Sequence, residues 1–136
     1  MNKFLQSEQS GAKVIVAGSG NPLRQFIYSR DLAKLLLWSL REYEGAGQRF
    51  CDPVILSVDE QDELSINEVV QSICRSLNFD PQRVVYDTSQ ADGQYRKTAS
   101  NRKLRELLPQ FKFTPFDAAI QETMDWFKAN YAAARK

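Results

Sequence analysis

The sequence of 136 residues contains no histidine and only two cysteines, Cys51 and Cys74. Without an imidazole, the chain has no histidine base, proton shuttle or histidine metal ligand. Two cysteines fall short of the four ligands of a structural zinc site. Because the sequence shows no secretion signal, we expect both to be reduced thiols. Cys74 lies in an apolar helical pattern and is expected in the core, whereas Cys51 lies in a loop. These residues favour neither a metal site nor a histidine-based mechanism.

Long apolar runs and an excess of one charge are also missing. No run approaches the ~20 residues that span a bilayer. The first residues lack the apolar stretch of a secretory signal, so we expect a cytoplasmic protein. Eighteen basic residues oppose seventeen acidic ones, and a net charge of +1 gives no general attraction for nucleic acid or membranes. The remaining composition, 43% hydrophobic and 26% charged, suits one compact domain or part of a larger one.

Short apolar strands alternate with helical patterns, which predicts an α/β fold. Buried or extended strands are predicted at 13–17, 24–28, 54–58 and 84–86. Helices are predicted at 29–43, 65–77, 101–108 and 115–134. Residues 1–12 are interpreted as the remnant of a helix that starts before Met1 and closes at Gly11. About four short strands are too few for a complete doubly wound nucleotide-binding domain.

Capping residues mark three of the predicted helices. Ser65 and Glu68 form a capping box, with a hydroxyl and a carboxylate three residues apart. The segment 29–31 (Ser-Arg-Asp) caps the helix that follows it. Pro115 occupies the first position of the last helix, where a missing N–H does no harm.

A glycine-containing turn, 18–22 (Gly-Ser-Gly-Asn-Pro), lies shortly before Arg24. Glycine lets a ligand approach the backbone closely, and arginine can form bidentate hydrogen bonds to phosphate. The turn lacks the third glycine of the dinucleotide fingerprint. The alternative interpretation is a hairpin turn that carries a surface arginine.

The loop 92–97 (Asp-Gly-Gln-Tyr-Arg-Lys) is the second candidate site. A carboxylate such as that of Asp92 can accept both hydroxyls of a ribose. Arg96 and Lys97 would then meet phosphate. The alternative is a solvated turn, because Asp-Gly is a common turn pair.

Three other clusters are interpreted as structural. A basic stretch faced by few acids is assigned to a solvated helix face rather than to nucleic acid; it comprises Arg96, Lys97, Arg102, Lys103, Arg105 and Lys112. The acidic run 59–63 precedes a helix N-terminus, where acids are favourable without a metal. Aromatic residues are expected to pack the last helix; they are Phe116, Trp126, Phe127 and Tyr131.

Together, these segments carry a family resemblance. The stretch 16–33 combines a glycine turn, an arginine, a hydrophobic-aromatic pair and an aspartate that starts a helix. It resembles a motif of extended short-chain dehydrogenases that act on nucleotide sugars. Within that superfamily the chain is similar to the C-terminal part of the GDP-L-fucose synthase family. The likeness runs from about residue 3 to residue 136 and rests on 21–28, 92–94, 97–101 and 113–116.

The resemblance implies a fold and an activity. The chain, 1–136, would be the small C-terminal substrate-binding domain of such an enzyme, with short strands, about four helices and no Rossmann domain. The family converts GDP-4-keto-6-deoxy-D-mannose to GDP-L-fucose by 3,5-epimerisation and NADPH-dependent 4-reduction. Its N-terminal Rossmann domain binds NADPH and supplies Ser, Tyr and Lys for reduction and Cys and His for epimerisation. The chain shows neither a Tyr-x-x-x-Lys pattern nor a histidine.

The resemblance also carries roles onto particular residues. Arg24 matches the family arginine at the GDP diphosphate, and Asp92 matches the acid at the nucleotide ribose. Arg96 and Lys97 are further candidates for the diphosphate. Ala17 stands where the family usually places a tryptophan that faces the substrate. No catalytic, cofactor-binding or metal-binding residue is assigned, because neither cysteine matches the family's catalytic one.

We therefore expect a GDP-sugar-binding portion that is inactive by itself and holds no cofactor of its own. Its partners would be GDP-4-keto-6-deoxy-mannose or GDP-L-fucose and the N-terminal Rossmann domain of a parent chain. The family implies a homodimer for that parent. Two alternatives stay open: part of another nucleotide-sugar epimerase or dehydratase, and a non-catalytic nucleotide-sugar-binding module.

Overall fold

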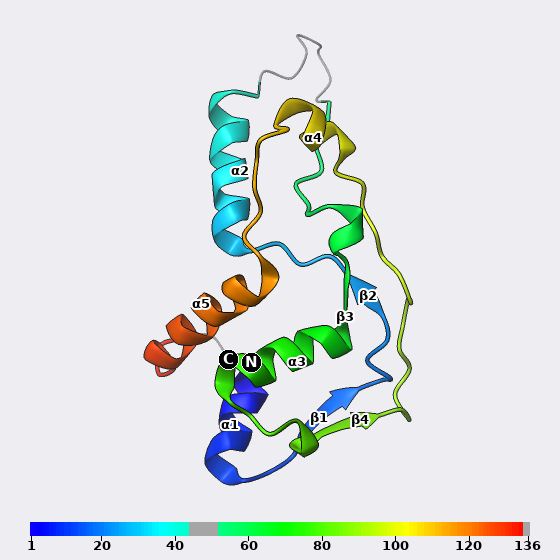
Figure 1. Cartoon of the computed structure of the whole chain (residues 1–136), viewed down its shortest axis with the longest axis vertical. Coiled ribbons are helices and arrows are strands. Elements are labelled where there is room, and N and C mark those ends of the chain that lie inside the picture. The colour runs from blue at the N-terminus through cyan, green and yellow to red at the C-terminus, as the bar shows by residue number, and fades with distance from the viewer. Residues whose placement is uncertain (44–51, 135–136) are drawn as a thin grey trace. The chain divides into compact units, whose positions relative to one another are not determined.

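Two groups of chain segments fold as separate units in the computed structural model, which describes residues 1–43 and 52–134 (Figure 1). The first unit contains Met1–Arg24, Leu64–Lys97 and Pro115–Lys136, and the second contains Gln25–Glu63 and Thr98–Thr114. Cys51 and most of the predicted loop 44–53 lie outside the described residues. Within the described ranges, no helix is long and apolar enough to cross a membrane.

Three helices surround the core of the first unit: α1 (Asn2–Ser10), α3 (Ile66–Leu77) and α5 (Phe116–Ala129). Apolar side chains recur on α3 and α5 at the spacing of one helical face, so each helix buries one stripe. The core consists of Phe4, Leu5, Val14, Val70, Ile73, Cys74, Leu77, Phe79, Ile120, Met124 and Phe127. Cys74 is 4% exposed, which confirms its predicted place, and burial raises the pKa of its thiol. Trp126 is 56% exposed, so its predicted role in packing the last helix is wrong.

Local sequence signals set several helix ends. Gly11 closes α1 in the left-handed conformation, with φ of 74°, as predicted. The Ser65 hydroxyl accepts a hydrogen bond from Glu68 N, and Glu68 Oε2 accepts one from Ser65 N, which confirms the capping box. The predictions for two other helix starts are wrong: Pro115 precedes the first helical residue, and the segment 29–31 provides no side-chain cap. Helix α5 begins at Phe116 with Pro115 at the N-cap, and α2 (Ser29–Arg41) begins without a side-chain cap.

The first unit contains two small sheets. Strand β1 (Val14–Ala17) pairs in parallel with β4 (Val84–Asp87), and Val14 lies opposite Val84. Strand β2 (Leu23–Arg24) pairs in antiparallel fashion with β3 (Leu64–Ser65). The hairpin interpretation of the turn 18–22 is therefore wrong, because the strands on either side of the turn pair with other strands. The remainder of the predicted strand 24–28 forms no ladder.

The β1–β4 sheet buries only one face. Val14 is 3% exposed, whereas Ile15 and its partner Val85 are 57% and 40% exposed. Successive strand residues point to opposite faces, so one set enters the core and the next set leaves it. The prediction of a fully buried strand at 13–17 is thus half correct.

The second unit has α2, a short 3-10 turn η1 (Glu60–Asp62), and α4 (Arg102–Leu107) around a small core. Leu35, Val58 and Leu104 are its buried apolar residues. Asp31 is also buried, at 1% exposure. It accepts hydrogen bonds from Thr114 N at 2.7 Å and Lys34 Nζ at 3.1 Å instead of capping its own helix. Burial alone would raise the pKa of Asp31, but these hydrogen bonds outweigh it and lower the pKa.

The segment 54–58 of the second unit forms no ladder with any described part of the chain, although its sequence predicts a strand. A strand is defined by hydrogen bonds to a neighbour, and an apolar sequence alone does not supply that neighbour. Its side chains are only partly covered, since Ile55 is 49% exposed and Val58 is 7% exposed.

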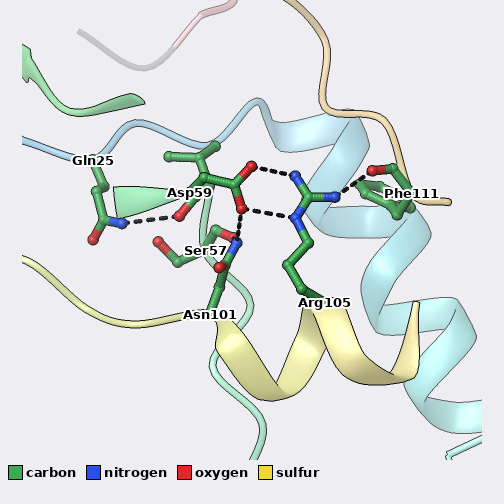
Figure 2. Close-up of polar contacts among 7 residues, drawn as sticks. Gln25, Ser57, Asp59, Asn101, Arg105 and Phe111 are labelled. Atoms are coloured by element: carbon green, nitrogen blue, oxygen red, sulfur yellow. Dashed lines mark hydrogen bonds and ion pairs between the residues drawn. The ribbon is translucent and has the colours of Figure 1, made fainter. Parts of the chain in front are cut away.

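A polar network built on Asp59 fixes this segment to α4 (Figure 2). Arg105 donates from Nε to Asp59 Oδ1 at 2.7 Å and from Nη2 to Oδ2 at 2.5 Å. Asn101 donates to Asp59 Oδ1 and to the carbonyl of Ser57. The hydrogen bonds from Arg105 hold the pKa of Asp59 below its ordinary value.

The structure corrects the interpretation of the basic stretch, because three of its cations have acidic partners. Arg105 pairs with Asp59, Lys103 with Asp52, and Arg102 with Glu106. The Lys103 ammonium also lies 5.6 Å from the ring centre of Tyr43. Lys103 and Arg105 therefore help to hold the second unit together, so the interpretation as a solvated helix face is wrong for these two residues and is confirmed for exposed Arg102.

We predict that Asp59→Asn lowers the free energy of unfolding by about 1–3 kcal/mol at pH 7, because it removes charged hydrogen bonds. The lowered pKa means that the stabilisation is present above the unfolded-state pKa near ~4 and is lost as pH falls through the folded-state value. The difference between variant and parent should therefore shrink between about pH 4 and pH 2. Urea unfolding at several pH values measures it.

Glu60→Gln is the matched control, because Glu60 is an exposed acid one residue away. It should leave the free energy of unfolding within about 0.5 kcal/mol of the parent. A loss at Asp59→Asn that stays constant down to pH 2 would show that the Asp59 charge is not its source.

Candidate functional site

The turn that follows β1 takes backbone conformations that favour glycine. Gly18 and Gly20 have φ of +83° and +80°. A Cβ on Gly18 would collide with Asp92 Oδ1, and a Cβ on Gly20 would lie 2.6 Å from Tyr86 Cε1. Because these two glycines have no side chain, the Asp92 carboxylate and the Tyr86 ring can pack directly against the turn.

Asp92 is held by the residue between the two glycines. Ser19 N donates to Asp92 Oδ1 at 2.5 Å, and Ser19 Oγ donates to Oδ2 at 2.6 Å. Both hydrogen bonds lower the pKa of Asp92, and the one from the Ser19 side chain has the larger effect. The carboxylate is exposed and ionised at neutral pH, so it can accept hydrogen bonds from a ligand.

Arg24 lies on β2 and binds the loop that carries Asp92. Its Nη2 donates to the carbonyl of Gln94 at 2.8 Å, and Nη1 donates to the carbonyls of Leu23 and Tyr95. Leu23 N also donates to the Tyr95 carbonyl at 2.8 Å. Strand β2 and the loop 92–96 are therefore joined by both backbone and side-chain hydrogen bonds.

The structure brings all the predicted binding residues to two segments that are hydrogen-bonded to each other, 17–24 and 92–97. Ala17 ends β1 opposite Asp87 and is exposed. Arg96 forms a parallel bridge with Leu23, and Lys97 follows it; both are exposed. Arg24 is partly exposed and Asp92 is exposed, so the two hydrogen-bonded segments carry one group that suits phosphate and one that suits hydroxyls.

Sequence reasoning missed three supporting residues. The sequence places Ser19 in the turn, and a hydroxyl between two glycines is the available signal of a side chain that can reach a carboxylate. The Tyr86 hydroxyl donates to Asn67 Oδ1, and Asn67 N donates to the Gly20 carbonyl at 2.9 Å. Burial raises the pKa of Tyr86. No sequence signal links Tyr86 to Asn67, because the contact depends on α3 and β4 lying together.

A metal centre finds no support in the described ranges 1–43 and 52–134, which contain no group of three or more acidic or cysteine side chains arranged to hold an ion. The acidic run 59–63 instead contributes Asp59 to the network around Arg105.

Comparison with known proteins shows which proteins the chain is similar to. The NAD dependent epimerase/dehydratase family matches residues 1–50. A probable GDP-L-fucose synthase of Drosophila melanogaster is 52% identical over 89% of the chain, and the GDP-L-fucose synthase of Dictyostelium discoideum is 46% identical over 100%. The chain spans only 36% and 41% of those two relatives.

Solved structures give the same result. A crystal structure of a GDP-L-fucose synthetase from Naegleria fowleri matches with a TM-score of 0.91 and 47% identity, over 99% of this chain and 39% of that one. A second structure of it is bound to NADP. The dTDP-glucose 4,6-dehydratase of Bacillus anthracis, at 18% identity and a TM-score of 0.76, shares the fold.

The structure matches a fragment of the extended short-chain dehydrogenase fold. Within this class, the chain is similar over nearly its whole length, in sequence and in structure, to one part of these GDP-L-fucose synthases.

We predict that Gly18→Ala destabilises the chain more than Gly11→Ala does. Both glycines have positive φ, but a Cβ on Gly11 meets nothing within 4 Å, whereas one on Gly18 collides with Asp92. The conformational strain of about 1–2 kcal/mol is common to both, and the collision is specific to Gly18. Urea unfolding measures the two losses, and equal losses would show that Asp92 does not pack against the turn.

Proposed function

We propose that the chain is the nucleotide-sugar-binding part of a GDP-L-fucose synthase. The whole protein would convert GDP-4-keto-6-deoxy-D-mannose to GDP-L-fucose by 3,5-epimerisation and NADPH-dependent 4-reduction. The observation that carries this proposal is that hydrogen bonds join β2, which carries Arg24, to the loop 92–96, which carries Asp92. The similarity of nearly the whole chain to such enzymes supports it.

Arg24 would bind the diphosphate. A guanidinium has five N–H donors, and the contacts of Arg24 with Leu23, Gln94 and Tyr95 within the described chain use three of them. The other two are then available for phosphate oxygens, while the backbone carbonyls hold the guanidinium plane in place. Arg96 and Lys97 would add positive charge on the same loop.

Asp92 would bind the nucleotide ribose, and Ala17 would line the sugar. The family's tryptophan at the position of Ala17 would fill far more space than a methyl group. The wall beside the sugar is therefore built differently in this chain, and other side chains must supply the apolar contact.

The cofactor does not fit the residues present here. A dinucleotide site needs a glycine turn that opens a helix, so that the helix N-terminus meets the pyrophosphate. The turn 18–22 leads into strand β2, and its glycines admit Asp92 and Tyr86. We therefore assign NADPH, and the groups that transfer hydride and protons, to the part of the relatives that this chain does not span. The share of this chain is to hold the nucleotide so that the sugar is positioned for that chemistry.

Two features of the second unit favour the proposal that this chain is part of a longer polypeptide. Leu36, Leu37 and Leu40 on α2 are 48%, 51% and 82% exposed, which is unusual for three neighbouring leucines. The apolar segment 54–58 has strand composition but no ladder in the described chain. Both features are explained if the remaining polypeptide, a Rossmann domain, pairs with 54–58 and covers α2.

We predict that Arg24→Ala weakens GDP binding by about 10- to 100-fold in the whole protein, as expected for loss of a charged hydrogen bond. Titration calorimetry with GDP measures the change, and kinetics should show it in KM more than in kcat. Arg102→Ala is the control, because Arg102 is exposed and forms an ion pair with Glu106 on its own helix. Unchanged GDP affinity for Arg24→Ala would remove the arginine from the site.

We predict a difference in amide exchange between the isolated chain and the whole protein. Amides of 55–58 should exchange rapidly in the isolated chain and slowly in the whole protein, where sheet pairing would protect them. Amides of β4 that pair with β1 should be protected in both. Rapid exchange of 55–58 in the whole protein would contradict the proposed strand pairing.

A further inference from the structure

Two hydrogen bonds from Ser19 hold Asp92 within the described part of the chain, and they go to different carboxylate oxygens. Ser19 N donates to Oδ1 and Ser19 Oγ to Oδ2. Asn21 N in turn donates to Ser19 Oγ at 3.1 Å. Since that N–H occupies an acceptor position of the hydroxyl, the hydroxyl proton points toward Asp92. The carboxylate plane is therefore set by the turn and not by the loop that carries Asp92.

A count of hydrogen-bonding positions shows what this arrangement leaves available. A carboxylate has about four acceptor positions, two on each oxygen. Ser19 fills one on each, so one position on each oxygen stays open. A ribose has two neighbouring hydroxyls and can donate one hydrogen bond to each oxygen. The number of open positions, one on each oxygen, thus matches a cis-diol.

The hydrogen bonds of the turn also disfavour a competing function, the binding of phosphate by its backbone. A glycine turn can bind phosphate through its backbone N–H groups. Here the Ser19 N–H is directed to Asp92, and the Gly18 N–H donates to the Asp87 carbonyl at 2.9 Å. The turn therefore binds a carboxylate of its own chain, which in turn binds the ligand.

We infer that Ser19 is a positioning residue that orients Asp92 for the ribose cis-diol and so determines the preference for a ribonucleotide over a nucleotide without these hydroxyls. The inference rests on the proposed function, because it takes GDP as the ligand. It adds a residue and a source of selectivity that the similarity to known proteins does not supply.

The test compares the affinities of the whole protein for GDP and for 2′,3′-dideoxy-GDP, both measured by titration calorimetry. The ratio of the two dissociation constants reports the diol alone, because the base and diphosphate are common to both. Ser19→Ala should reduce this ratio by about 3- to 10-fold, the range of one hydrogen bond. Ser19→Thr, which retains the hydroxyl, should restore it.

Ser89→Ala is the matched control. Ser89 N and Oγ both donate to Asp87 Oδ1, at 3.1 Å and 2.5 Å, so this variant loses a similar exposed serine–aspartate contact in the same unit. Its ratio should equal that of the parent. A double variant, Ser19→Ala with Asp92→Asn, should show no further loss of the ratio beyond Asp92→Asn, because Ser19 acts through Asp92.

The outcomes separate the inference from the proposed function. A parent protein that prefers GDP, with the same ratio in folded Ser19→Ala, overturns the role of Ser19 and leaves GDP binding intact. A parent that binds both nucleotides equally overturns the diol contact as well. A parent that binds neither nucleotide overturns the proposed function itself. Should Ser19→Ala fail to fold, a reduced ratio in Ser19→Gly supports the inference and an unchanged ratio overturns it.

Discussion

The candidate site depends on the pair of hydrogen bonds by which Ser19 holds the carboxylate of Asp92, a residue 73 positions further along the chain. This pair closes the turn 18–22 against the loop 92–97 and gives the acid a fixed orientation. The contact requires glycine at position 18, because any Cβ there would occupy the place of the carboxylate oxygen. A small change in one residue type would thus separate the turn from the residue that we assign to the ribose.

Other residues of the first unit hold the turn in place. Parallel pairing of β1 with β4 places Tyr86 under Gly20, and the start of α3 supplies Asn67 to both. Hydrogen bonds between β2 and the loop then fix Arg24 beside the same segment. The helices supply most of the apolar core, so the polar residues near the turn are left for specific contacts. A site built in this way is arranged before a ligand arrives, which lowers the entropy cost of binding.

The second unit is stabilised in a different way. Its apolar core is small, and charged groups contribute much of its cohesion through Asp31, Asp59 and Arg105. Charged hydrogen bonds are strong where the groups are partly shielded from water, so they can fix short irregular segments that lack a ladder. Two parts of this unit are not stabilised in this way. The leucines of α2 expose apolar surface, and the segment 54–58 has no ladder partner in the described chain.

The sequence by itself determined features that depend on neighbouring residues. Helical periodicity gave α3 and α5, glycine gave the end of α1, and Ser65 with Glu68 gave a capped start, because each signal acts within one or two turns of chain. The types of residue at 24 and 92 also indicated phosphate and ribose chemistry. Tertiary structure alone decided which strands pair, which donors bind the Asp31 carboxylate, and that Ser19 orients Asp92. These contacts join residues far apart in sequence, and a local pattern shows what a side chain can bond but not which distant group the fold brings to it.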